Sequence, residues 1–363
     1  MTWTTTLLSA DLDTLVSAHI ADGSYTYAEV LNLVLGTAVG GITADELHDL
    51  RTVYDNSTGL FTSDYLRYIT EAYIYGSVAN GRWTGGAATA AGVAVLDNLA
   101  PSSTQENINR LIGKWFLGTD HPMPVAGGDT ATGKASQSTF IYSEATGPLF
   151  VDGVAVSDIN QGQIGDCYLL AALGGIADAA PDIIMDSIID NENGTYGIRF
   201  YIDDRAVYVT VDSNIITNKT SSRIAGAGNS AKSLTDEKWV SLYEKAFAQL
   251  NTLTAVRGDI WIPENSYQSI ESGRGQGIKI ISNIGYNYYS HTKYSDVAED
   301  PFSSPLSMIN LDGVSESTIK GNLIASLSRG EFFHFQPRGN SLGENGKTNF
   351  LIGHAFMLLD YRE

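Results

Sequence analysis

The chain has 363 residues, of which 43% are hydrophobic and 17% are charged, and its formal net charge at pH 7 is −19. A chain of this length and composition can bury a substantial core and form two domains of ordinary size. The negative charge disfavours nucleic acid and anionic membranes as partners, because both would repel the protein. The one cysteine, Cys167, excludes an intrachain disulfide and any metal site of several cysteines, so its thiol is either buried filler or a nucleophile.

The first residues, MTWTTTLLSADLDTL, lack the basic start, the long apolar run and the small-residue cleavage site of a signal peptide. No window of the sequence holds the ~20 apolar residues that a membrane-spanning helix needs. The composition is poor in Lys and Cys and rich in Gly, Thr, Ala, Asn and Asp. Because bacterial proteins exported without an N-terminal signal often have this composition, we expect secretion by such a route, with the cytoplasm as the alternative.

Residues 1–120 are expected to form a helical N-terminal domain. Apolar residues recur at three- and four-residue spacing in five segments, namely Asp11–Ile20, Tyr27–Leu35, Thr43–Tyr54, Ser63–Tyr75 and Gln105–Leu117. Thr43, with Glu46 three residues later, has the pattern of a capping box at the start of the third segment. The pattern therefore predicts an all-α arrangement for this part of the chain.

Residues 121–148 lack a helical period and are rich in Gly, Ser, Thr and Pro, so we expect a linker that is open to proteolysis. Beyond it, helices come first and strands last, which indicates an α+β domain over residues 149–363. We expect helices at Tyr168–Ala180 and Asp236–Asn251, and a hairpin over Tyr196–Asp212 that turns at an Asp-Asp pair. Two late strands are expected in EFFHFQP and NFLIGHAFMLLDY, joined by a Gly/Asn-rich loop.

The position of Cys167 in the sequence favours a chemical role for its thiol. Gly165 and Asp166 precede it and an apolar helix follows, so the sulfur is expected at a helix N-terminus. There, the partial positive charge and the N–H groups favour a thiolate and can hold an oxyanion. Such a thiolate needs a proton-accepting partner, usually His, and a third group that orients the His.

The segment QGQIGDCYLLAA, residues 161–172, resembles the nucleophile segment of the calpain family of cysteine proteases, Q-G-x-x-G-D-C-W-L-L-A-A. Tyr168 stands where the family usually has Trp. Four further segments resemble family segments in the same order, namely VYVTVDSNI (207–215), EKWVSLYEKAFAQLN (237–251), PENSYQSIESGRG (263–275) and GHAFMLLD (353–360). They are similar to a strand, the helix FWSALLEKAYAKLN, a glycine-bearing loop and the histidine strand of the family. The resemblance covers residues 149–360 and leaves the first ~120 residues unmatched.

The resemblance implies a papain-like protease core behind the all-α domain, with a helical subdomain and an antiparallel β subdomain that is either complete or truncated. It implies a cysteine-type endopeptidase, a thiol protease that hydrolyses protein or peptide substrates. Cys167 would be the nucleophile, His354 the general base and acid, and Gln161 a side-chain donor to the oxyanion. Gly353 and Gly273 would give backbone room for an extended substrate.

The histidine and its orienting residue leave questions open. His334 is the rival to His354, because aromatic residues flank it in a predicted strand. The family's orienting Asn has no counterpart that we can identify, since Asp360 lies about 20 Å from His354 along a strand and Asn349 points to the opposite face. We therefore expect either a portion of a longer protein that supplies the Asn, or a naturally weak or inactive protease.

The resemblance also implies a calcium site formed by the carbonyls of Val151 and Gly153 and the carboxylates of Asp158 and Glu244. The alternative is that Asp158 caps a turn and that Glu244 pairs with a basic residue on the surface. Two other functions stay open, a non-catalytic protein-binding module of the same fold and a papain-like acyltransferase. The N-terminal domain is expected to act on the protease core, as the prosegment of a zymogen or as a regulator.

Overall fold

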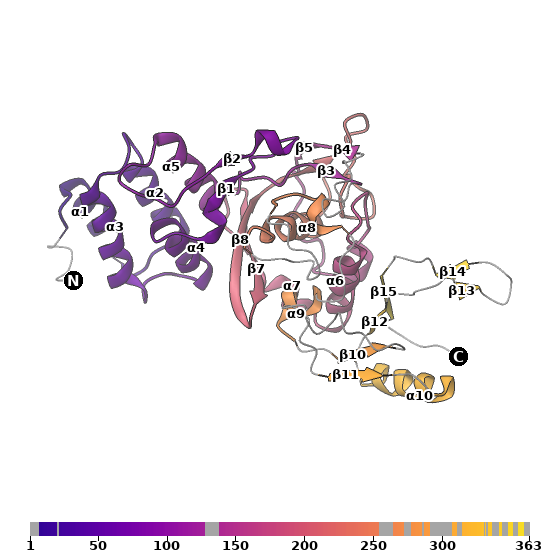
Figure 1. The fold of residues 1–363 in the computed structure, drawn as a ribbon. Coiled ribbons are helices and arrows are strands. Elements are labelled where there is room, and N and C mark those ends of the chain that lie inside the picture. The colour runs from indigo at the N-terminus through magenta and orange to yellow at the C-terminus, as the bar shows by residue number, and fades with distance from the viewer. Residues whose placement is uncertain are drawn as a thin grey trace. The chain divides into compact units, whose positions relative to one another are not determined.

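The structure is a computed structural model (Figure 1). It describes residues 7–19, 22–127, 138–253, 264–271, 277–284, 287–290, 307–310, 314–329, 331, 333–335, 341–342, 348–350 and 355–358. The chain divides into two compact units. Unit 1 comprises Met1–Met123, Ile189–Arg199 and Val207–Asp212, and unit 2 comprises Pro124–Ile188, Phe200–Ala206 and Ser213–Glu363. The unit that holds the N-terminal helices therefore also takes in two later pieces of the chain, which the expected boundary at residue 120 does not include.

Unit 1 is mainly helical, as the apolar spacing predicts. Its helices are α1 (Ala10–His19), α2 (Tyr27–Thr37), α3 (Ala44–Ser57), α4 (Asp64–Ile74) and α5 (Gln105–Ile112), followed by the π-helical turn η4 (Gly113–Leu117). Two short strands, β1 (Arg82–Trp83) and β2 (Ala94–Val95), pair antiparallel between α4 and α5. The predicted capping box is confirmed, because the Thr43 hydroxyl accepts from the Glu46 N–H and the Glu46 carboxylate accepts from the Thr43 N–H.

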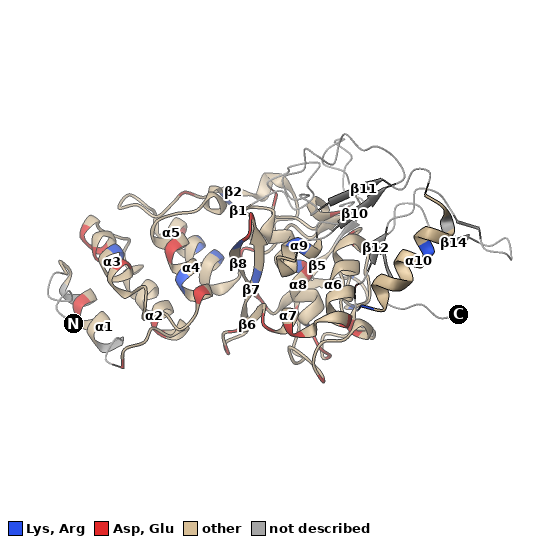
Figure 2. Ribbon diagram, turned by 90° about the horizontal axis from the view of Figure 1, so that it is seen from below, with Lys and Arg blue, Asp and Glu red and all other residues tan. Residues whose placement is uncertain are grey.

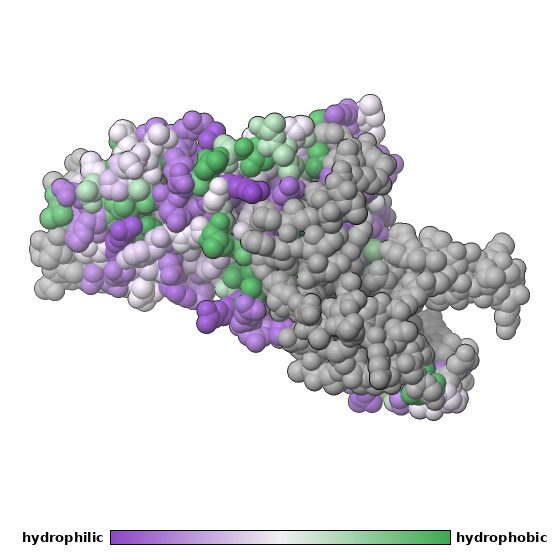
Figure 3. Space-filling model, viewed as in Figure 1, coloured by the Kyte–Doolittle hydropathy of each residue, from purple (hydrophilic) through white to green (hydrophobic). Residues whose placement is uncertain are grey.

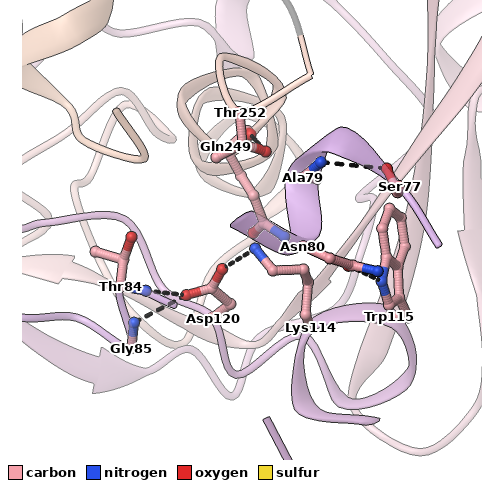
Figure 4. A network of polar contacts seen from close by, with 10 residues as sticks. All are labelled: Ser77, Ala79, Asn80, Thr84, Gly85, Lys114, Trp115, Asp120, Gln249 and Thr252. Atoms are coloured by element: carbon pink, nitrogen blue, oxygen red, sulfur yellow. Dashed lines mark hydrogen bonds and ion pairs between the residues drawn. The ribbon is translucent and has the colours of Figure 1, made fainter. Parts of the chain in front are cut away.

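A buried ion pair lies in the core of unit 1 (Figure 4). Lys114, on the π-helical turn, contacts Asp120, and their side chains are 2% and 0% exposed. The other oxygen of Asp120 accepts the N–H groups of Thr84 and Gly85 at 2.7 and 2.9 Å. Paired buried charges with further hydrogen bonds cost much less than an isolated buried charge, so this contact ties the turn to the segment after β1.

The predicted hairpin is confirmed as β7 (Thr195–Ile202) and β8 (Arg205–Asp212), which form a three-stranded sheet with β6 (Ile188–Asp190). The turn residues Asp203 and Asp204 have φ angles of 49° and 62°. Two consecutive left-handed residues are what a two-residue type I′ hairpin requires, and Asp tolerates that region better than most residues. The Asp-Asp pair therefore sets this hairpin's register.

Unit 2 combines helices with mostly antiparallel strands, so its fold class is α+β, as expected. Its helices are η5 (Val156–Asp158), α6 (Cys167–Ala179), α7 (Pro181–Met185), α8 (Trp239–Leu250), η6 (Gln268–Ile270), α9 (Gly277–Ser282) and α10 (Glu316–Leu327). Its strands are β3 (Val125–Ala126), β4 (Ser138–Thr139), β5 (Ile141–Glu144), β9 (Asn214–Thr217), β10 (Asn287–Ser290), β11 (Ser307–Asn310), β12 (Phe333–Phe335), β13 (Ser341–Leu342), β14 (Thr348–Phe350) and β15 (Phe356–Leu358). Strands β10 and β11 pair in parallel, whereas β12 pairs antiparallel with β15.

The structure corrects the expected linker at residues 121–148. Strand β3 pairs antiparallel with β4, and β5 pairs antiparallel with β9. The last residue of β5, Glu144, lies opposite the first residue of β9, Asn214, which is 70 residues further along the chain. The expectation rested on local composition, which does not report pairing between segments so far apart in the chain. Both flanks of this segment, up to Gly127 and from Ser138, therefore belong to ordered structure of the protein.

The surface of the described residues is mixed in polarity. Figure 2 shows acidic residues on α1, α3 and α5, in keeping with the negative net charge. On the face seen in Figure 3, hydrophobic and hydrophilic residues are interspersed over the described part of the chain. Within that part, no helix has both the length and the apolar character needed to cross a membrane.

Candidate active site

Cys167 is the first residue of α6, where the sequence places it. The helix that follows is almost wholly apolar, and Tyr168 through Ala177 are buried. Tyr168 packs edge-on against Phe247 of α8 at 6.1 Å between ring centroids, and its hydroxyl donates to the Ile270 carbonyl at 3.0 Å. The tyrosine therefore fills a core position and satisfies its polar end, while the half-buried thiol stays at the helix tip.

The end of the chain that carries the predicted histidine strand meets the nucleophile helix. Strands β12 and β15 both pack against α6, as Figure 1 also shows. The backbone N–H of Ala355 donates to the Cys167 sulfur at 3.2 Å across 188 residues of sequence. His354 and Gly353 lie just outside the described residues, as does Gly273. The rival His334 lies in β12, where it pairs with Met357 of β15.

The predicted oxyanion donor, Gln161, lies in the loop that leads to Cys167. Its side-chain N–H donates to the Ile164 carbonyl at 3.0 Å. A primary amide has two N–H bonds, so this contact can hold the side chain in place while the second bond serves the oxyanion. The loop is further held by Glu271, which accepts the N–H groups of Gly165 at 3.2 Å and Gly127 at 2.9 Å.

Sequence patterns did not single out Glu271. Its side chain is 9% exposed and joins two backbone segments that lie far apart in the sequence. A buried carboxylate is stable only when donors surround it, and here backbone N–H groups supply them. The one available signal is that Glu271 lies within the segment that resembles the glycine-bearing loop, which does not by itself indicate this contact.

Two of the four predicted calcium ligands, Val151 and Asp158, lie beside Glu237, an acidic residue that was not predicted. Asp158, on η5, accepts the N–H of Ala155 at 2.7 Å, so it does cap a turn, and it also accepts the indole N–H of Trp239 at 3.3 Å. Glu237 accepts the Val151 N–H at 3.2 Å. Burial raises the pKa of the Glu237 carboxyl to about 7, and repulsion from Asp158 contributes. Two carboxylates that repel each other beside the Val151–Gly153 turn suit a hard divalent cation with oxygen ligands.

Glu244 does not lie with these groups. Its carboxyl is 1% exposed and accepts the Ala227 N–H at 2.8 Å. Burial and then repulsion from Glu244 raise the pKa of Asp166 well above its ordinary value, so these two carboxyl groups lie close together. Glu237 is therefore the acidic residue placed beside Val151 and Asp158, and the burial of Glu244 excludes the surface ion pair that was its alternative. Sequence spacing alone could not decide between Glu237 and Glu244 as the candidate ligand. The two residues are seven positions apart, which is about two turns of a helix, so a helix would carry both on the same face.

Comparison with known proteins finds sequence similarity in the part of the chain that contains Cys167. Residues 138–257 match the family described as "Calpain family cysteine protease". The "Calpain-type cysteine protease ADL1" of Oryza sativa subsp. japonica is 28% identical over 227 residues, which is 59% of this chain and 9% of that protein. The "Calpain-type cysteine protease DEK1" of Zea mays is 27% identical over 227 residues, again 59% of this chain and 9% of that protein.

The chain thus spans about a tenth of the length of these relatives. The matched segment contains the nucleophile helix α6, the hairpin β7–β8 and the helix α8. The matched segment begins at β4. Residues 138–257 are therefore similar in sequence to the calpain family of cysteine proteases.

Proposed function

We propose that the protein is a cysteine endopeptidase in which Cys167 attacks a peptide carbonyl and His354 transfers the proton. The observation that supports this most is the hydrogen bond from the Ala355 N–H to the Cys167 sulfur. His354 is joined to Ala355 by one peptide bond, and consecutive Cα atoms are about 3.8 Å apart. The imidazole is thus carried by the residue next to the one whose N–H contacts the Cys167 sulfur.

The reaction would proceed through two transfers of an acyl group. The thiolate of Cys167 forms a bond to the carbonyl carbon, and the C–N bond of the peptide breaks as the imidazolium of His354 gives its proton to the leaving amine. Water, deprotonated by the same imidazole, then attacks the thioester and releases the carboxylic acid and the thiol. Gln161 and the Cys167 N–H would stabilise the oxyanion of each tetrahedral intermediate.

We also propose a calcium ion held by the carboxylates of Asp158 and Glu237 and by the carbonyls of Val151 and Gly153. The bound cation would neutralise the mutual repulsion of the two carboxylates. It would stabilise the segment between β5 and α6 and so support the loop that carries Gln161. The residues of this chain, and not the ion, perform the chemistry on the peptide.

The test is peptide hydrolysis by the full chain, with and without calcium, compared with the Cys167→Ala variant. We expect new peptide amino termini with the native chain and none with the variant. A Cys167 thiol that reacts neither with peptide nor with iodoacetamide would favour the protein-binding module. Transfer of the acyl group to an added amine faster than hydrolysis would favour the acyltransferase.

A further inference from the structure

Glu244 has an unusual environment for an acidic residue. It lies in the middle of α8, and its carboxyl is almost fully buried. One oxygen accepts the Ala227 N–H at 2.8 Å. The other oxygen packs so closely on Gly226 that a Cβ there would lie 2.1 Å from it. The carboxyl group is thus built into the loop Ala225–Gly228, which we call the support loop.

The same carboxyl group meets the residue before the nucleophile. Asp166 is the N-cap residue of α6, yet its side chain does not cap the helix. It is fully buried, and its carboxyl lies against the carboxyl of Glu244. Because two adjacent buried carboxyl groups cannot both ionise, the Asp166–Glu244 pair holds a proton between its members. Lys232 approaches both carboxyls, Cys167 lies beside Asp166, and Tyr267, immediately before η6, is also near the pair.

The support loop in turn carries the loop before the nucleophile, Asn160–Asp166. Asn160 and Gly228 exchange two backbone hydrogen bonds, at 3.0 and 3.1 Å. The N–H of Gln163 donates to the Ala225 carbonyl at 2.7 Å. Gly162 has no room for a side chain, since a Cβ would lie 2.1 Å from the Gly226 carbonyl oxygen. A displacement of the support loop would therefore move the segment that holds Gln161.

We propose that Glu244 is a positioning residue, whose carboxyl group fixes the support loop and Asp166 to α8 and thereby sets the position of Cys167 and Gln161. This inference rests on the proposed function, because it assigns Glu244 to the geometry of that reaction. The site requires the length of the Glu244 side chain and does not require its negative charge. The Glu244 side chain must span from α8 to both the Ala227 N–H and the Asp166 carboxyl.

Two substitutions of Glu244 separate the effect of side-chain length from the effect of charge. Glu244→Gln keeps the length, can still accept from Ala227, and can donate to Asp166 in place of the shared proton. Glu244→Asp keeps the acid but shortens the side chain by one methylene, about 1.5 Å. A matched control is Ser241→Ala, which removes the other tether of α8 to the support loop, the hydroxyl that donates to the Ala227 carbonyl at 2.7 Å.

The readouts are kcat and KM for peptide hydrolysis, the rate of Cys167 alkylation by iodoacetamide, and amide exchange at Asn160 and Gln163. The folded fraction of each variant is measured by circular dichroism and kcat is corrected for it, because iodoacetamide alkylates the thiol of an unfolded chain as well. We expect Glu244→Asp to lower kcat about 10²-fold, as a shift of about 1 Å in a catalytic group does, with KM little changed. It should also speed amide exchange at both positions, whereas Glu244→Gln stays close to the native chain. Ser241→Ala, which leaves the contact of Glu244 with Asp166 intact, should have a smaller effect than Glu244→Asp on both kcat and amide exchange.

The opposite ranking would overturn the proposal. If Glu244→Asp kept the native kcat and amide exchange while Glu244→Gln lost them, charge would be the required property and the residue would act as an acid or as a ligand. If the native chain hydrolysed no peptide, the proposed function would fail. The positioning role would then be decided by amide exchange and alkylation, since neither needs turnover.

Discussion

Calcium should stabilise the protein, and the gain in stability should depend on pH through Glu237. The carboxyl of Glu237 has a pKa of about 7 because it is buried and lies beside Asp158. Near pH 8 most of this carboxyl is ionised and open to a cation. At pH 6 only about a tenth is ionised, so calcium must displace a proton and its affinity should fall about tenfold.

The size of the effect follows from mass action. Calcium at about 100 times its dissociation constant adds about 2.7 kcal/mol to the free energy of unfolding. In a domain of about 150–250 residues this corresponds to a rise in the unfolding midpoint of about 5–10 °C. A tenfold loss of affinity at pH 6 removes about 1.4 kcal/mol, which is half of the gain.

The assay is thermal unfolding of the full chain at pH 6 and pH 8, with calcium, with magnesium and with a chelator. Glu237→Gln should remove the calcium-dependent rise, and Glu244→Gln should keep it. Magnesium should have a smaller effect, because it demands a tighter octahedral geometry than two carboxylates and two carbonyls provide. The reasoning would be refuted by equal calcium shifts at both pH values, or by a loss of the shift in Glu244→Gln alone.

Three further outcomes are expected. Asp120→Ala should lower the free energy of unfolding in urea by about 3–5 kcal/mol, because it leaves the buried Lys114 ammonium unpaired, and a cost under about 1 kcal/mol would contradict the buried pair. Glu244→Gln should flatten the pH dependence of stability: the raised pKa of this carboxyl means that the folded protein keeps a proton the unfolded chain releases, so native stability falls as pH rises above the ordinary value of 4.5. An unchanged pH slope in the variant would be inconsistent with the buried acid pair. Gln161→Ala should lower kcat about 10²-fold with little change in KM, whereas a lower melting temperature at full kcat would limit Gln161 to its contact with Ile164.

The nucleophile helix was predictable because its signals are local. The apolar run after Cys167 fixes α6, and the segment from Gln161 to Ala172 has enough defined positions to indicate its chemistry. The helix expected through Leu117 ends earlier, at Ile112, and continues as a π-helical turn that carries Lys114. Spacing of apolar residues cannot report that change, since it depends on where Lys114 must reach Asp120.

The candidate metal ligands and the strand β5 could be identified only from the tertiary structure. Glu237 and Glu244 both flank apolar residues of one helical segment, and only the fold shows that one turns toward Asp158 and the other toward Asp166. Strand β5 is short and polar, and its partner β9 lies far along the chain. Such pairing is decided by long-range contacts, which single-sequence patterns do not contain.

The central claim is that Cys167 and the histidine next to Ala355 act together on a peptide. The most direct measurement is the rate at which an activated peptide ester acylates Cys167, followed by mass spectrometry in the full chain and in His354→Ala and His334→Ala. We predict a thioester on Cys167 in the full chain and in His334→Ala, formed about 10²-fold more slowly in His354→Ala. No acylation of Cys167, or normal acylation in His354→Ala with loss in His334→Ala, would contradict the account.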